Sequence, residues 1–134
     1  MGYRIDVMAL VYPDAIESTL EERAKYEQLK VLMATTFKDV SDKFGDPFMT
    51  WMDKDCVLKF DIRDVKWYPS YPDVMMLTDM LETLGCDDVE EGGIPGYCTE
   101  FIRIGEDNTD VDEEHRGEDN QYYLTVRRSI DCNV

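Results

Sequence analysis

Apolar and polar residues alternate most regularly between Cys56 and Trp67. Every second residue from Cys56 to Ile62 is apolar, and charged side chains fill most of the positions between them. This period of two is typical of a β-strand with one buried and one exposed face. At Asp64 the pattern shifts by one residue, so that Val65 and Trp67 become the apolar positions. The shift predicts a β-bulge, because later side chains would otherwise change faces. We expect this long strand to be a central one.

Four other stretches have the composition of strands. Tyr3–Tyr12 alternates at its start, becomes apolar on both sides in its second half, and is followed by Pro13, which ends it. Phe48–Met52 closely precedes the long strand and should form a hairpin with it. The last two are rich in aromatic and β-branched residues, and they are Tyr97–Ile104 and Gln121–Ile130.

Two stretches have the three-to-four-residue period of an amphipathic helix. The first is predicted as one long helix from Ser18 to Phe44, and Ser18 and Glu21 have the spacing of a capping box. The second should begin at Ser70, carry Pro72 in its first turn and end at Gly85. The helices are predicted to share one core with the long strand, formed by Phe37, Leu58, Phe60, Leu77 and Leu81.

The order of these elements predicts the fold class. The 134 residues are enough for one domain with a proper core. Two helices with one apolar stripe each, against an antiparallel sheet of four to five strands, give an α+β two-layer sandwich. The simplest topology for this order is the ferredoxin-like βαββαβ arrangement, with one extra C-terminal strand.

The chain is strongly acidic. It has 30 acidic against 14 basic residues, a formal net charge of -16. Phosphate binding needs a basic stripe, so direct nucleic-acid binding is not expected, and a basic protein surface is the natural partner. No apolar run approaches the length of a membrane span. The four cysteines are widely spaced and form no CxxC pair, which favours buried thiols in a reducing cytoplasm over a disulfide framework.

The acidic residues are concentrated in one part of the chain. Residues 87–120 contain thirteen acids against Arg103 and Arg116. Within this part, residues 105–120 show no apolar periodicity, and we expect a loop that is mobile or that orders on a partner. A loop of this kind aids solubility or binds a partner, and charge pattern alone leaves both open. As partner-binding residues it offers Glu106, Asp107, Asp110, Asp112, Glu113, Glu114, Glu118 and Asp119.

A compact acidic chain can inhibit a nucleic-acid-binding protein. Carboxylates at the spacing of DNA phosphates can occupy a basic groove, helped by release of counterions. This hypothesis resembles, in kind only, the acidic phage proteins that inhibit host nucleases or polymerases, and it predicts an anti-restriction or anti-CRISPR role in a host cytoplasm. An aromatic cluster of Trp67, Tyr68 and Tyr71 is a second candidate interface, with corner packing as the alternative.

An enzyme is the competing hypothesis. Polymerase palms and nucleotide cyclases place one Asp on the first strand and others on the next hairpin, where they bind Mg²⁺. Asp6, Asp53 and Asp55 occupy such positions, although turns favour Asp in any case. An EF-hand loop counted from Asp110 fails at its Gly and Glu positions. His115 is the single histidine, so two-His sites are excluded. No catalytic, metal or cofactor site is assigned, and an acidic accessory protein remains the third possibility.

Overall fold

The computed structural model describes residues 4–14, 18–46, 48–106, 110–117, 120–126 and 130–134. Its main sheet is antiparallel and has five strands in the order β2-β3-β1-β4-β5. The strands are β1 (Ile5–Pro13), β2 (Met49–Met52), β3 (Val57–Val65), β4 (Tyr97–Ile104) and β5 (Val111–Arg116). With the three α-helices described below, this architecture confirms the predicted α+β class.

The centre of the sheet is β1, which pairs with β3 on one side and β4 on the other. All of its residues except Asp6 are buried, because helices cover one face and a hairpin covers the other. The long strand β3 lies between β2 and β1, so it is an inner strand as predicted, but the central strand of the sheet is β1. The bulge of β3 is confirmed: Ile5 pairs with Val65 but Val7 with Ile62, and Asp64 has a φ of 54°.

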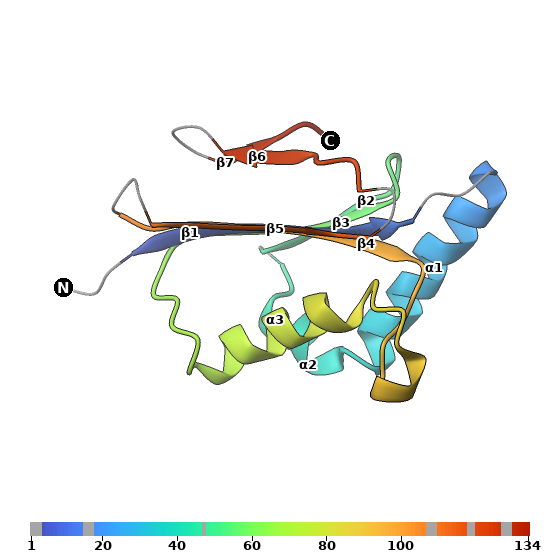
Figure 1. Cartoon of the computed structure of the whole chain (residues 1–134), viewed down its shortest axis with the longest axis horizontal. Coiled ribbons are helices and arrows are strands. Elements are labelled where there is room, and N and C mark those ends of the chain that lie inside the picture. The colour runs from blue at the N-terminus through green and yellow to red at the C-terminus, as the bar shows by residue number, and fades with distance from the viewer. Residues whose placement is uncertain (1–3, 15–17, 47, 107–109, 118–119, 127–129) are drawn as a thin grey trace.

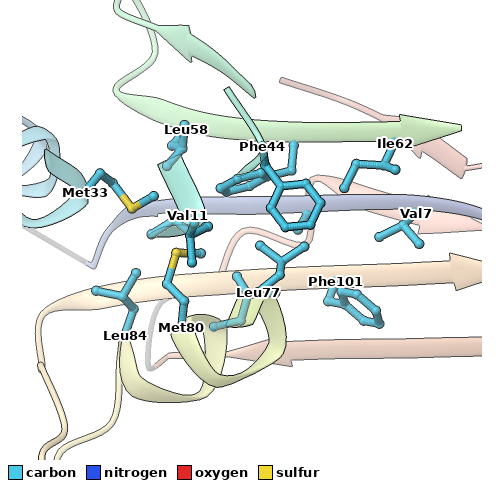
Figure 2. Packing of buried hydrophobic residues seen from close by; sticks show 14 of the residues in the cluster. Val7, Val11, Met33, Phe44, Leu58, Ile62, Leu77, Met80, Leu84 and Phe101 are labelled. Carbon is cyan, nitrogen blue, oxygen red and sulfur yellow. The ribbon is translucent and has the colours of Figure 1, made fainter. Parts of the chain in front are cut away.

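Three α-helices pack on one face of the sheet (Figure 1). They are α1 (Thr19–Thr35), α2 (Lys38–Lys43) and α3 (Pro72–Thr83). Their apolar side chains form one core with β1, β3 and β4, and Figure 2 shows Met33 of α1 and Met80 of α3 pointing toward Val11 of β1. The predicted shared core is confirmed: Leu58, Phe60, Leu77 and Leu81 are buried in it, and Phe37 packs against it half-buried.

The helix boundaries differ from the prediction at two places. The single helix predicted for Ser18–Phe44 is divided between α1 and α2, because Phe37 leaves the helical conformation at φ -111° and ψ 32°. Two β-branched residues, Thr35 and Thr36, precede this break and lower the helix propensity there. The capping role of Ser18 is confirmed, since its hydroxyl accepts a hydrogen bond from the Glu21 N–H. The second helix starts at Pro72, with Tyr71 at the N-cap position instead of the predicted Ser70.

A second, two-stranded sheet forms a third layer over the other face of the main sheet (Figure 1). It is an antiparallel hairpin of β6 (Leu124–Val126) and β7 (Ile130–Cys132). Leu124 and Ile130 close a second apolar core over Met8, Leu10 and other side chains of the main sheet. The prediction of one extra strand over Gln121–Ile130 is therefore wrong, and so is the expectation of only two layers.

The fifth strand of the main sheet lies inside the segment that was predicted to be a loop. Val111–Arg116 forms β5, which pairs with β4 from Ile104↔Val111 to Thr99↔Arg116. The prediction of an unstructured connection over residues 105–120 is wrong for these six residues. The reason is that an edge strand can be polar on both faces, so its sequence shows no apolar alternation.

Candidate functional site: an acidic groove between α3 and β5

A groove of about 500 Å³ lies between α3 and the outer strands β4 and β5. Its apolar lining comes from both layers and includes the buried side chains of Val74, Leu81 and Phe101. Its polar lining residues are Thr78, Arg103, Glu82, Asp112, Glu113 and Glu114. The acids are exposed, whereas Val74, Leu81 and Phe101 are buried. A basic side chain with a long aliphatic stem matches such a surface.

The acids of β5 are directed by the register of the strand. Successive side chains of a strand point to opposite faces. Asp112 and Glu114, opposite Arg103 and Phe101 of β4, therefore face the helices and the groove. Glu113 lies between these two residues in the sequence. Its side chain is directed to the hairpin side, although the residue also borders the groove.

Arg103 fixes the acidic end of the groove. Its guanidinium donates hydrogen bonds to Asp110 at 3.2 and 2.8 Å and to Asp112 at 3.0 and 2.7 Å. These bonds, with Asp110 the larger cause, raise the pKa of Arg103. The Arg103 side chain is 18% exposed and that of Asp112 is 63% exposed. An approaching molecule therefore meets the carboxylate before the guanidinium beneath it.

The second basic residue, Arg116, links the two walls of the groove. Its guanidinium lies 3.1 Å from Glu114 on β5 and 3.9 Å from Glu82 on α3. Each of these three side chains is more than a third exposed, so water screens the pairs and their contribution to stability is small. Their effect is to hold the carboxylates of the two walls near one another.

The predicted aromatic cluster divides at this groove. Trp67 is half-buried, lines the groove and packs on Phe101 with a centroid distance of 6.3 Å. Tyr68 and Tyr71 are 40% and 39% exposed and form an edge-to-face pair at 5.1 Å. Met75, on the exposed side of α3, is 49% exposed. Trp67 thus fits the packing interpretation, whereas the two tyrosines remain exposed as an interface requires.

The other predicted acids do not line the groove. Glu106 is exposed and accepts a hydrogen bond from the Arg4 N–H at 2.7 Å. Asp110 lies beneath the rim, where it pairs with Arg103. The predicted residues Asp107, Glu118 and Asp119 lie outside the described residues. The structure therefore brings together Asp112, Glu113, Glu114 and Trp67, four of the eleven predicted interface residues.

A buried carboxylate behind β5 was not predicted. Glu100 of β4 is 0% exposed and faces the C-terminal hairpin. Its oxygens accept hydrogen bonds from the Tyr12 hydroxyl at 2.7 Å and from the N–H groups of Tyr123 and Leu124 at 3.2 and 2.9 Å. Burial, followed by the hydrogen bond to Glu100, raises the pKa of Tyr12. A single acid inside the apolar stretch Tyr97–Ile104 was the signal that could have revealed this site.

His115 connects this buried carboxylate to the acidic strand. Its side chain is 7% exposed, and its Nδ1 lies 3.1 Å from Glu100 Oε1, out of line for a hydrogen bond. Its Nε2 forms a hydrogen bond of 2.8 Å with Glu113, and its ring stacks on Tyr122 at 4.4 Å. His115 is therefore held by defined contacts, although it lies in the segment that was predicted to be a mobile loop. The contacts tie the middle of β5 to the segment that leads into β6.

The carboxylates of the palm-like hypothesis do not come together. Asp6 accepts a hydrogen bond from the Asp64 N–H at one end of the β1–β3 ladder. Asp53 lies in the β2–β3 turn at the other end, where it accepts hydrogen bonds from Tyr26 and Lys30. Asp55 belongs to the same turn. About six residues of strand, roughly 20 Å, separate the two groups. Within the described ranges, no group of three or more His, Cys, Asp or Glu residues could hold a metal ion.

Comparison with known proteins identifies no relative of this chain. No family model matches the chain, and neither a curated protein nor a solved structure matches it. In the part of the chain that the structure describes, no helix is both long and apolar enough to cross a membrane. Among the described residues no cysteine forms a disulfide, and the predicted burial is confirmed for Cys56 and Cys98. The function of the groove therefore has to be argued from its own residues.

Proposed function

We propose that the chain is an acidic protein-binding inhibitor that blocks a nucleic-acid-binding protein, such as a nuclease, by mimicking DNA. The observation that carries this proposal is the groove, in which Trp67 lies on one surface with Glu82 of α3 and with Asp112 and Glu114 of β5. Basic nucleic-acid-binding surfaces combine Lys and Arg side chains with apolar and aromatic contacts. The groove presents the complement, because exposed carboxylates flank buried apolar side chains.

The geometry of β5 supports the mimicry. Residues of an antiparallel strand advance by ~3.4 Å each, and one strand of DNA carries one charge per ~3.4 Å of helix axis. Side chains on one face of a strand are two residues apart, so Asp112 and Glu114 repeat negative charge on the groove side at about twice the axial spacing of phosphates along a DNA strand. Both side chains are exposed, which leaves their carboxylates accessible to a basic partner.

We also infer that the strands β2-β3-β1-β4 form a ferredoxin-like core to which β5 is added. Their antiparallel pairing and the position of the helices on one face support this topology. The topology does not decide function, since such folds host many unrelated activities. Cys56 and Cys98 are buried and form no disulfide among the described residues, which supports a reducing cytoplasm as the site of action.

The test is capture of partners from a cell lysate on the immobilised chain, followed by competition with duplex DNA. Bound partners should be released by the duplex and by high salt, because exposed charges are screened beyond ~8 Å at physiological ionic strength. The double variant Glu113→Gln/Glu114→Gln should bind roughly 2- to 30-fold more weakly, from two exposed charges worth ~0.2–1 kcal/mol each. These two positions spare the contacts of Arg103 with Asp110 and Asp112.

A matched control carries the same change of charge elsewhere. Glu90 and Glu91 are exposed on a short 3-10 helix and do not line the groove. The variant Glu90→Gln/Glu91→Gln should bind partners as the wild-type chain does. Equal binding by both double variants and the wild type, with a partner that still accepts DNA, would refute mimicry by this groove. It would favour the solubility interpretation, for which reduced solubility is the single expected defect.

A further inference from the structure

The outer edge of β5 is an open strand edge beside the acidic groove. β5 is the last strand of the main sheet, and within the described residues β4 is its only neighbour in the sheet. We propose that the partner of this chain adds an extended segment to β5, with basic side chains at alternate positions. This inference rests on the proposed function and specifies how the partner is held.

The register of β4 and β5 identifies the backbone groups at this edge. Gly105 donates its N–H to Asp110 at 2.8 Å, so this pair is of the hydrogen-bonded type. Pairs alternate between the two types along an antiparallel ladder. The N–H and C=O groups of Asp112 and Glu114 therefore point toward β4. Those of Val111, Glu113 and His115 point away from β4, toward the open edge.

The side chains of β5 determine which strand can add there. A second copy of the chain would place carboxylates against carboxylates, and like charges directly opposite one another are destabilising. Acidic residues on an edge commonly prevent such self-pairing. The same residues favour a basic strand, since opposite charges directly across a strand pair are stabilising. The edge therefore excludes a copy of itself and accepts a basic segment.

Alternation places the partner's side chains on defined surfaces. Residues paired with Asp112 and Glu114 lie on the helix side, above the groove that Trp67 lines. Lys or Arg at these two positions would reach the carboxylates with its charge and the apolar lining with its stem. The position paired with Glu113 lies on the hairpin side and also favours a basic residue. A partner with Lys or Arg at every second residue of an extended segment fits this edge.

The probe is a synthetic, end-capped peptide in which lysine and valine alternate. The control peptide has the same composition with its lysines in one block. We expect the alternating peptide to bind more tightly. It should slow hydrogen exchange at the amides of Val111, Glu113 and His115, measured by NMR, while Asp112 and Glu114 change little. If both peptides bind equally without this pattern of protection, or if neither binds, strand addition is wrong.

Two variants at one position separate backbone from charge. Glu113→Pro removes an outward N–H but not the pairing with β4, since proline is tolerated at an edge whose N–H faces solvent. This variant should weaken binding of the alternating peptide about tenfold or more, as expected for a lost hydrogen bond and a blocked edge. Glu113→Gln removes only a charge and should weaken binding of the same peptide by no more than about fivefold. Unchanged exchange at the inward amides of Asp112 and Glu114 verifies that Glu113→Pro is folded.

The same variants distinguish this inference from the proposed function. If Glu113→Pro binds captured partners as the wild type does while Glu113→Gln/Glu114→Gln does not, strand addition fails and mimicry by charge stands. If the double variant also binds as the wild type does, the proposed function itself fails. Loss of binding in both, with Glu113→Gln close to wild type, supports both proposals.

Discussion

Replacing Glu100 should show how much of the fold depends on one buried carboxylate. In Glu100→Ala, the Tyr12 hydroxyl and the N–H groups of Tyr123 and Leu124 lose their acceptor. A buried donor without a partner costs ~1–3 kcal/mol. Three such donors would together cost ~3–9 kcal/mol, and entry of water into the space offsets part of this sum. We therefore expect a loss near the lower end, ~3–5 kcal/mol.

A graded series tests the reasoning. Glu100→Gln keeps one acceptor oxygen but turns an amide NH₂ toward either Leu124 N–H or Tyr123 N–H, so it should cost ~1–3 kcal/mol for one unsatisfied donor. Tyr12→Phe removes a hydroxyl that also accepts a hydrogen bond from the Gln121 N–H, and it should cost a similar amount. The expected order of stability is wild type, then Glu100→Gln and Tyr12→Phe, then Glu100→Ala.

Urea denaturation measures these losses through the fluorescence of Trp51 and Trp67, which pack against the helix-side core. If the hairpin leaves the sheet before global unfolding in Glu100→Ala, the m-value falls as well, because less surface remains to be exposed. Hydrogen exchange of β6 and β7 should then be faster than that of β1. A loss of unfolding free energy below ~1 kcal/mol for Glu100→Ala, or no difference from Glu100→Gln, would refute the conclusion that Glu100 holds the C-terminal hairpin on the main sheet.

Two further predictions concern the helix-side core. Phe60→Ala should lower the free energy of unfolding by ~3–5 kcal/mol, because Phe60 is fully buried beside Phe44; a loss under ~1 kcal/mol in urea denaturation would contradict its place in the core. Burial raises the pKa of Tyr97 to about 12 from an ordinary value of 10. The contribution of this tyrosine to stability is therefore complete below pH 10 and is lost as the pH rises toward 12. Tyr97→Phe lacks the titrating hydroxyl, so its free energy of unfolding should decline less steeply over this alkaline range than that of the wild type.

The sequence predicted those elements whose two faces differ. The strand around Leu58 and Phe60 has one buried face, so its alternation indicated both the strand and its bulge at Asp64. β5 has charged or half-buried side chains on both faces, and its place at the edge leaves no alternation to detect. The hairpin of β6 and β7 was merged into one strand because each of its strands has only three residues.

The candidate site was predicted in parts but not as a unit. The acids at Asp112–Glu114 and the aromatic Trp67 were both recognised from composition. Their proximity follows from the sheet order, in which β4 returns beside β1 and brings β5 past α3. No local pattern contains that order. Glu100 was missed for a related reason, since the donors that satisfy it lie on β1 and after β5, distant in sequence.

The position of β1 has a consequence for synthesis on the ribosome. β1 precedes every other described element, yet its partners β3 and β4 follow it by about 50 and 90 residues. Until those strands emerge, a nine-residue apolar segment has neither of its sheet neighbours. Such non-local pairing slows folding and leaves the nascent chain exposed to aggregation. We therefore expect the emerging chain to depend on chaperones until β4 is complete, and the abundance of acidic residues to help keep it soluble meanwhile.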